Sequence, residues 1–285
     1  MKLATIVSYL VAKLPRRILS GLMPLQGAMH RLFPFMKSKQ MTEFTIPSGI
    51  LKGKKFLLTY DEAKRYWHGG FEPGLLETFK EYVSSGMTVY DVGANLGFHS
   101  LALGVLVGER GKVFGFEPNP SILARLKNNI SLNGAAKNVE AVGYAVLDRE
   151  GEIGFSVSEV HHAQSQVAEL VPLANGVGFA RTIRILAITL DAFVFERSQP
   201  APDIVKIDIE GAEHLAIEGM RRILRECRPL LFVELHNFVA AKAALETLLE
   251  FEYSTKHLSL GDLAVEMLDG ITWASQTNYL FAEPK

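Results

Sequence analysis

The sequence predicts an open α/β sheet with a ligand-binding turn after one of its strands. The segment Met87–Ser100, MTVYDVGANLGFHS, places β-forming residues in a short apolar run and ends that run with a turn containing two glycines. The apolar segment FHSLALGVLV follows Gly97 and is typical of a helix packed on a sheet. Two further apolar runs, DIVKIDI at 203–209 and PLLFVELH at 229–236, are typical of buried strands. A strand, a tight turn and a helix N-terminus are where such a sheet holds a ligand.

The residues of this turn narrow the class of ligand. A dinucleotide-binding fingerprint starting at Gly93 would need glycines at positions now held by Asn95 and Phe98, and a phosphate-binding P-loop is also absent. Glu117 lies 20 residues beyond Gly97, at the expected tip of the second strand, where a carboxylate accepts hydrogen bonds from both hydroxyls of a ribose. A ribose-binding carboxylate without a pyrophosphate loop predicts a nucleoside ligand, and S-adenosylmethionine is the leading candidate. A solvated glutamate beside a glycine-rich turn of some other α/β protein is the alternative.

Composition and charge indicate a folded globular protein with a distinct N-terminal segment. The chain has 285 residues, of which 48% are hydrophobic and 21% charged. Its one cysteine, Cys227, excludes an intramolecular disulfide and agrees with a reducing, cytoplasmic compartment. Residues 1–40 contain seven of the 30 lysines and arginines and no acid, so the rest of the chain has 23 basic against 31 acidic residues.

We therefore predict a basic helical extension at residues 1–44 and a single domain at 45–285. The apolar positions of the extension fall at steps of three and four residues: Leu3, Val7, Leu10 and Leu14. The apolar run is too short to span a bilayer and lacks the features of a secretory signal. We favour a lid or dimer arm over the domain's own apolar surface. Peripheral contact with anionic lipid at the inner membrane face is the alternative, and no nucleic acid is expected.

Short elements precede the central turn. Residues 41–60 predict two short strands around the turn PSGILKGKK, and GLLETFKEYV at 74–83 predicts a helix. The segment Tyr66–Pro73, with aromatic residues beside paired glycines, either covers a pocket or caps this helix with Glu72 at its start.

Further elements follow the central turn. Asn119-Pro120 predicts the start of a helix that ends at Asn133-Gly134. Val139–Val146 predicts the third strand. The segments EIGFSVS and RTIRILAI flank a polar loop at 159–180 and predict a hairpin-like insertion. Within that loop His161-His162 are expected to be solvated, because adjacent histidines point in different directions.

The two apolar strands near the C-terminus carry polar residues at informative positions. Lys206 lies within the first of them and needs a carboxylate partner if it is buried. Glu234 and His236 share one face of the second, because side chains alternate along a strand. The turn EGAE leads into a helix after the first strand, and an amphipathic helix at 240–249 follows the second. Weaker strands near 252–258 and 278–282 complete the chain.

Five motifs, taken in order, resemble those of the FkbM-type methyltransferases. They are DVGANLG at 91–97, FEPNP at 116–120, TLDAF at 189–193, KIDIEGAE at 206–213 and VELH at 233–236. The likeness spans roughly residues 70–282 and places Asn95 where the generic class I loop has its middle glycine. It implies a Rossmann-like class I methyltransferase that uses S-adenosylmethionine. The implied sheet is seven-stranded and mostly parallel, with an antiparallel last strand and helices on both faces. The usual reaction is O-methylation of a sugar, glycolipid or other small molecule.

The expected cofactor contacts come from the ends of the first three strands. Gly93 and Gly97 would let the backbone pass close to the cofactor without a Cβ in the way. The full set is Asp91, Gly93, Ala94, Asn95, Gly97, Glu117, Pro118 and Ala145.

Methyl transfer to a hydroxyl requires alignment of the reactants and a base for the departing proton. Asp208 and Glu210 follow the fourth strand, and Glu234 and His236 end the fifth, so all four open toward the crevice of the cofactor turn. His236 is the first candidate for the base, because imidazole titrates near neutral pH. Glu234 would orient it, and Asp208 and Glu210 are alternatives.

Alternative roles remain open for these residues. Glu234 could instead neutralise Lys206, and His236 could cap the following helix. A Mg²⁺-type ion held by Asp208, Glu234 and His236 is compatible with the residue types but not required, and no metal is predicted. The strand end reads DIEG rather than an N-P-P-Y type motif, which argues against methylation of a base amine. A non-catalytic nucleoside-binding module is the second functional class.

Overall fold

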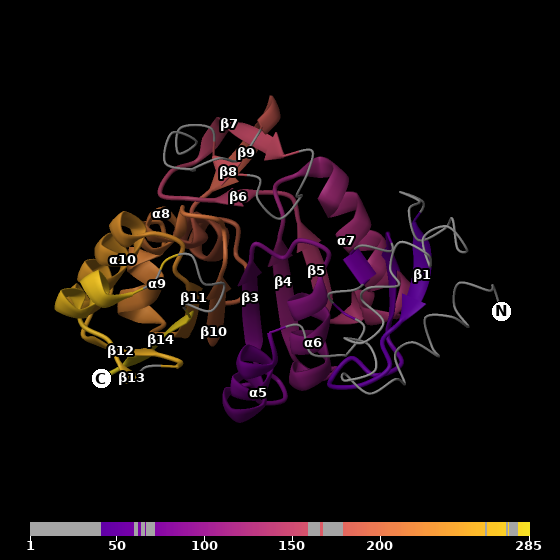
Figure 1. Ribbon diagram of the computed structural model, residues 1–285, viewed down its shortest axis with the longest axis horizontal. Coiled ribbons are helices and arrows are strands. Elements are labelled where there is room, and N and C mark those ends of the chain that lie inside the picture. The colour runs from indigo at the N-terminus through magenta and orange to yellow at the C-terminus, as the bar shows by residue number, and fades with distance from the viewer. Residues whose placement is uncertain are drawn as a thin grey trace, which may run out of the picture.

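A central sheet of eight strands organises the computed structural model, which describes residues 41–59, 62–63, 66, 72–158, 166–167, 179–259, 261–271, 273 and 279–285 (Figure 1). Its order is β13-β12-β14-β11-β10-β3-β4-β5. The strands are β3 (Thr88–Val92), β4 (Lys112–Phe116), β5 (Val139–Val142), β10 (Ile204–Ile207), β11 (Leu230–Glu234), β12 (Tyr253–His257), β13 (Gly261–Asp262) and β14 (Tyr279–Pro284). Strands β5, β4, β3, β10 and β11 pair in parallel, and β14 is antiparallel to both β11 and β12. This is the expected seven-stranded arrangement, with the two-residue β13 added at one edge.

Helices cover both faces of the sheet, as expected. The first face packs against α5 (Pro73–Tyr82), α6 (Phe98–Val107) and α7 (Pro120–Leu132). The second packs against α8 (Glu213–Glu218), α9 (Arg221–Glu226), α10 (Phe238–Glu250) and the π-helical η6 (Ala192–Glu196). The short 3-10 helices η3 (Ala135–Lys137) and η7 (Val265–Gly270) lie in connecting segments.

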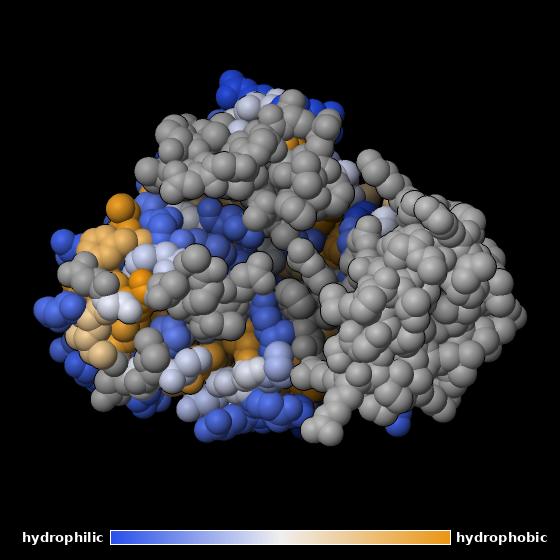
Figure 2. Space-filling model, viewed as in Figure 1, coloured by the Kyte–Doolittle hydropathy of each residue, from blue (hydrophilic) through white to orange (hydrophobic). Residues whose placement is uncertain are grey.

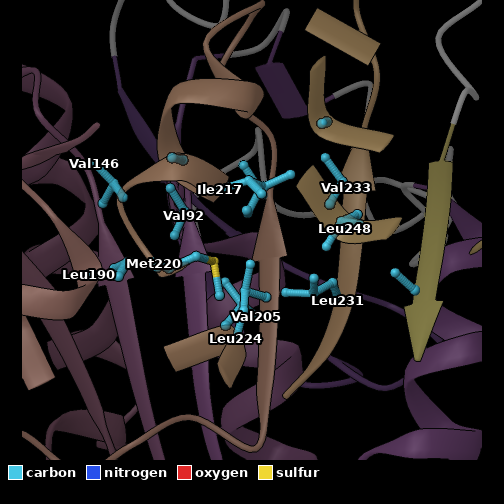
Figure 3. Close-up of a cluster of buried hydrophobic side chains, with 14 of the residues drawn as sticks. Val92, Val146, Leu190, Val205, Ile217, Met220, Leu224, Leu231, Val233 and Leu248 are labelled. Carbon is cyan, nitrogen blue, oxygen red and sulfur yellow. The ribbon is translucent and has the colours of Figure 1, made fainter. Parts of the chain in front are cut away.

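Alternation along the strands divides the core into two clusters. In β3, Val89 packs into the cluster under α5–α7, whereas Tyr90 and Val92 pack into the cluster under α8–α10. Figure 3 shows the second cluster, in which valines of neighbouring strands lie beside Ile217, Met220 and Leu224. These side chains are fully buried, and each such burial stabilises the fold by about 1.5–3 kcal/mol.

Capping residues set the ends of the helices that follow the strands. Asn119 accepts a hydrogen bond from the Ser121 backbone N–H at 3.1 Å, and Pro120 is the first residue of α7, as predicted. Asn237 accepts from the Ala240 N–H at 2.9 Å and starts α10 two residues earlier than expected. His236 is therefore not the cap of this helix, because the residue after it supplies the side-chain oxygen.

A second sheet carries the insertion, at the top of Figure 1. It has the order β6-β9-β7-β8, with β6 (Ala145–Val146), β7 (Gly151–Ser158), β8 (Gln166–Val167) and β9 (Phe179–Ile188). The antiparallel pairing of β7 with β9 confirms the predicted hairpin. The prediction of one strand over Val139–Val146 is wrong. The chain leaves the central sheet after Val142, because Ala145 and Val146 pair with β9 and Ala145 packs against the hairpin. His161-His162 lie outside the described residues.

The N-terminal hairpin is part of the domain. Strands β1 (Thr42–Thr45) and β2 (Lys55–Leu58) pair antiparallel, as predicted, and the Leu57 N–H donates to Asn129 of α7 at 2.8 Å. The domain therefore includes Thr42, and its predicted start at residue 45 cuts through β1. Residues 1–40 lie outside the described part of the chain. Within the described part, no helix is long and apolar enough to cross a membrane.

Candidate active site

Lys206 connects the turn after β3 to the end of β10. Its ammonium lies 3.1 Å from Asp91 Oδ1 and 3.5 Å from Asp208 Oδ2, and it donates to the Gly93 carbonyl at 3.3 Å. Lys206 is 1% exposed, and burial opposes its charge, yet the two aspartates raise its pKa. The predicted pairing of Lys206 with a carboxylate is confirmed by Asp91, its register partner on β3, and by Asp208. The alternative in which Glu234 neutralises Lys206 is therefore not needed.

Packing against backbone requires the first of the two glycines of the turn, and both glycines have left-handed backbone conformations. A Cβ on Gly93 would lie 1.8 Å from the Asp208 carbonyl oxygen, and one on Gly97 would lie 2.5 Å from Leu126 Cδ1. Both also have positive φ, at 84° and 89°. The absent side chain of Gly93 therefore lets two protein segments meet, and the approach of a ligand to the two glycines stays a prediction.

Asp91 lies behind the turn and not at its surface. It is fully buried, accepts a hydrogen bond from the Ser100 hydroxyl at 2.5 Å and pairs with Lys206. This burial favours a supporting role behind the turn, and direct contact between Asp91 and a cofactor stays a prediction. Ala94 is also buried, and half-buried Asn95 occupies the left-handed region at φ 49°, which asparagine tolerates.

Glu117 occupies the predicted position at the tip of β4. Its two carboxylate oxygens accept from the Asn95 N–H at 3.1 Å and the Asn119 N–H at 2.8 Å. Burial raises its pKa to about 7, although both backbone bonds favour the ionised form. Each oxygen keeps a further acceptor position for a ribose hydroxyl. Pro118 is half-buried beside it, whereas Ala145 is buried in β6 of the second sheet.

The structure brings His236 together with Asp208 and Glu210, as predicted. His236 Nε2 lies 3.7 Å from Asp208 Oδ1 and 3.8 Å from Glu210 Oε2. Its Nδ1 lies 2.8 Å from Oε1 of Glu213, a fully buried residue that starts α8. The residue that orients His236 is therefore Glu213 and not Glu234. Glu213 stands in the EGAE turn, but its role depends on α8 facing the end of β11.

These contacts decide the charge of His236. Burial disfavours the imidazolium, but Glu213, Asp208 and Glu210 outweigh it and raise the pKa of His236 to about 10. At neutral pH both ring nitrogens then carry hydrogen, so the side chain has no lone pair with which to accept a proton. This charge state disfavours His236 as the general base, and that role stays a prediction. The imidazolium instead holds the carboxylates around it.

A second group of titratable side chains lies beside the first. The Tyr279 hydroxyl is 2.6 Å from Glu72 Oε2 and 2.8 Å from Glu234 Oε2. His99 Nε2 lies 3.4 Å from Glu72 Oε2. Burial raises the pKa of Glu72 to about 7 and that of Glu234 to about 8, and it lowers the pKa of His99 to about 4. Sequence reasoning noted Glu72 only as a helix start and did not find His99 or Tyr279.

Asp208, Glu234 and His236 each offer one ligand atom, and these atoms lie within 4.8 Å of one another. Each of the three groups already has a partner in the protein: Lys206 for Asp208, Tyr279 for Glu234 and Glu213 for His236. We assign no metal to them, and a metal-assisted reaction is an alternative that chelation tests.

Comparison with known proteins adds to this geometry. Residues 91–257, more than half of the chain, match the family model described as the methyltransferase FkbM domain. The chain belongs to this family. It is a methyltransferase, and S-adenosylmethionine is its methyl donor.

Relatives of this FkbM-family methyltransferase include a named sugar-modifying enzyme. The hexuronic acid methyltransferase AglP of Haloferax volcanii is 28% identical over 188 residues, which cover 65% of this chain and 71% of AglP. A protein-L-isoaspartate O-methyltransferase of Triticum aestivum is 30% identical over 84 residues, 30% of this chain and 33% of that protein. The solved structure of methyltransferase FkbM from Methylobacillus flagellatus is 15% identical, with a TM-score of 0.46 over 90% of this chain and 60% of that one. At that score the structural likeness has no bearing on function.

The site of this FkbM-family methyltransferase has an excess of carboxylates. Those described are Glu72, Asp91, Asp208, Glu210, Glu213 and Glu234, and the cations among them are Lys206 and His236. Fields from closely spaced charges are strong where water is largely excluded. A site of this sign favours the sulfonium and ammonium groups of S-adenosylmethionine.

Proposed function

We propose that this methyltransferase transfers the methyl group of S-adenosylmethionine to a hydroxyl of a sugar, most directly a hexuronic acid residue of a glycan. The observation that carries the proposal is the carboxylate-rich site at the ends of β10 and β11, next to the cofactor turn. The likeness to a hexuronic acid methyltransferase supports the choice of acceptor.

The reaction class follows from the charge of the site. A neutral hydroxyl can enter a carboxylate-rich crevice without repulsion and finds groups there that accept its proton. The carboxylate of a hexuronic acid would be repelled by the same groups, since like charges at close range cost several kcal/mol where water is excluded, so the sugar has to enter with a hydroxyl toward them and its carboxylate pointed away. The hydroxyl oxygen attacks the methyl carbon, the carbon–sulfur bond breaks and its electron pair neutralises the sulfonium. The hydroxyl proton passes to the protein.

The test is methyl transfer from radiolabelled S-adenosylmethionine to oligosaccharides with and without a uronic acid residue. We expect a product that is stable to mild alkali, as a methyl ether is. Release of the label by alkali would show a methyl ester and contradict the choice of a hydroxyl. The control is Glu140→Gln, which removes the charge of an exposed glutamate paired with Lys112. It shows whether purification and assay of a variant by themselves change the measured methyl transfer.

Two further outcomes are informative. Cofactor binding without turnover on any glycan, measured by calorimetry, would favour a non-catalytic nucleoside-binding module. Loss of turnover with a chelator, restored by Mg²⁺ or Mn²⁺, would favour the metal-assisted alternative.

A further inference from the structure

Tyr279 joins two glutamates that are far apart in the sequence. Glu72 precedes α5, Glu234 ends β11, and Tyr279 begins β14. Glu234 and Tyr279 are register partners in the antiparallel β11–β14 pair. Tyr279 is 4% exposed and Glu234 is 8% exposed, whereas the Glu72 side chain is 18% exposed. Glu72 is therefore the member of the group most open to an acceptor.

The number of hydrogens in this group limits its protonation. The phenol oxygen lies 2.6 Å from Glu72 Oε2 and 2.8 Å from Glu234 Oε2, and both are hydrogen-bond distances. The hydroxyl has one hydrogen, so it can donate to only one of the two carboxyl groups. The other contact needs a hydrogen on its carboxyl group, because two bare oxygens with lone pairs facing each other repel. One of the two glutamates is thus a carboxylic acid.

The surroundings indicate which glutamate holds the proton. Glu72 Oε2 accepts from the Tyr279 hydroxyl, and the Glu72 side chain is 18% exposed, so its ionised form keeps more contact with water than that of Glu234. Glu234 is more buried and lies beside Asp208, whose negative charge, after burial, is the next largest cause of the raised pKa of Glu234. The titratable groups facing this pair are Asp91, Lys206, Asp208, His99 and His236.

We propose that Glu72, Tyr279 and Glu234 form a proton relay in which Glu72 takes the proton of the acceptor hydroxyl. This rests on the proposed function. Glu234 first releases its own proton toward Asp208, whose side chain is 24% exposed. Tyr279 then passes its hydroxyl hydrogen to Glu234, and Glu72 passes the proton of the acceptor to the Tyr279 oxygen. One proton enters the relay and one leaves it. No oxidant or reductant takes part.

Substitutions at the two ends and the centre test the relay. Tyr279→Phe keeps the ring and removes the bridging hydroxyl, and Glu72→Gln keeps the shape and removes the proton acceptor. We expect each to lower kcat by about 10²–10⁴-fold, the usual contribution of a positioned base, with unchanged affinity for S-adenosylmethionine. The matched control is Tyr253→Phe, whose buried hydroxyl donates to the Pro229 carbonyl away from the site. It should retain full kcat.

Two readouts separate a relay from a structural role. The acidic limb of the kcat–pH profile should move in Tyr279→Phe and not in Tyr253→Phe. Difference infrared spectra of the unliganded protein should show the carbonyl band of a buried carboxylic acid, and Glu234→Gln should remove it. A Tyr279→Phe enzyme with kcat within about threefold of wild type and an unmoved pH profile would overturn the relay, as would absence of the band. The infrared result needs no acceptor, so failure to methylate any sugar would count against the proposed function alone.

Discussion

His236 shows how neighbouring charges decide what one side chain can do. An isolated imidazole titrates near neutral pH, which makes it the natural candidate for a base. Here Glu213, Asp208 and Glu210 surround it, and its pKa rises to about 10 despite burial. The residue types in the sequence were the right ones, but their arrangement converts the expected base into a fixed cation.

The charge of His236 predicts a pH dependence of stability. Its folded-state pKa is raised from 6.5 to about 10, so its stabilising contribution is complete below about pH 6.5 and is lost as pH rises through about 10. The difference in unfolding free energy between wild type and His236→Ala should therefore be constant in acid and shrink above neutral pH. Glu213→Gln should lower the pKa of His236 in an NMR titration. An unchanged pKa in that variant would show that Glu213 does not hold the proton.

Glu117 predicts a pH dependence of cofactor binding. Its pKa is raised to about 7, and ribose hydroxyls donate best to the ionised carboxylate. Affinity for S-adenosylmethionine should therefore rise as pH increases through about 7 and level off above it. Glu117→Ala should weaken binding by roughly 1.5–3 kcal/mol and remove the pH dependence, as measured by calorimetry. A cofactor analogue without ribose hydroxyls should bind both proteins equally, and equal losses for both ligands would place Glu117 elsewhere.

The turn after β3 and the end of β10 form one packed unit. Gly93 lies against the Asp208 backbone, Lys206 donates to the Gly93 carbonyl, and the Asp208 N–H donates to the Val92 carbonyl at 3.0 Å. Two adjacent parallel strands thus present the turn at Gly93 and the Asp208 carboxylate as one packed edge. A change in either segment affects the other.

Gly93→Ala should therefore destabilise the fold itself. The substitution adds left-handed backbone strain of about 1–2 kcal/mol and an overlap with the Asp208 carbonyl worth about 1–3 kcal/mol. Gly53→Ala is the matched control, since Gly53 has φ +83° and open space around it, so only the strain applies. Urea denaturation measures both. Equal destabilisation of the two variants would show that the Gly93 turn relaxes around the added methyl group.

Charge and apolar surface are unevenly distributed over the whole chain. Seven basic and no acidic residues precede residue 41, and the remainder is acidic. Figure 2 shows hydrophobic residues gathered over α10, where Phe238, Val239 and Leu249 are exposed at 37%, 63% and 45%. Phe238 and Val239 directly follow the His236-Asn237 pair at the site. The exposed apolar side chains of α10 are suited to contact with another apolar surface.

The basic arm predicts one of two distinct phenotypes on deletion of residues 1–40. If the arm binds anionic lipid, deletion should abolish salt-sensitive sedimentation with anionic vesicles. If it covers an apolar surface of the domain or joins two copies, deletion should change oligomer size or solubility. Light scattering and vesicle sedimentation on both proteins distinguish the two. Vesicle binding that persists without the arm would exclude a membrane role for it.

Local patterns in the sequence were enough to predict much of the fold. Asn119-Pro120 starts α7, the apolar runs form β3, β10 and β11, and Glu117 stands at the tip of β4. Each of these features depends on residues that are close together in the sequence. The motifs likewise indicated the family and its cofactor, because the glycine-rich turn and the strand-end acids lie in contiguous stretches.

Only the tertiary structure decided which charges meet. Lys206 pairs with Asp91 through the parallel β3–β10 register, and Glu213 reaches His236 because α8 faces the end of β11. Tyr279 reaches Glu72 across 207 residues of chain, because β14 lies between β11 and β12. Proton affinities depend on distances and burial within a few ångströms, and strand order sets these distances. The sequence by itself therefore determined where the site lies, and the fold decided which of its groups can accept a proton.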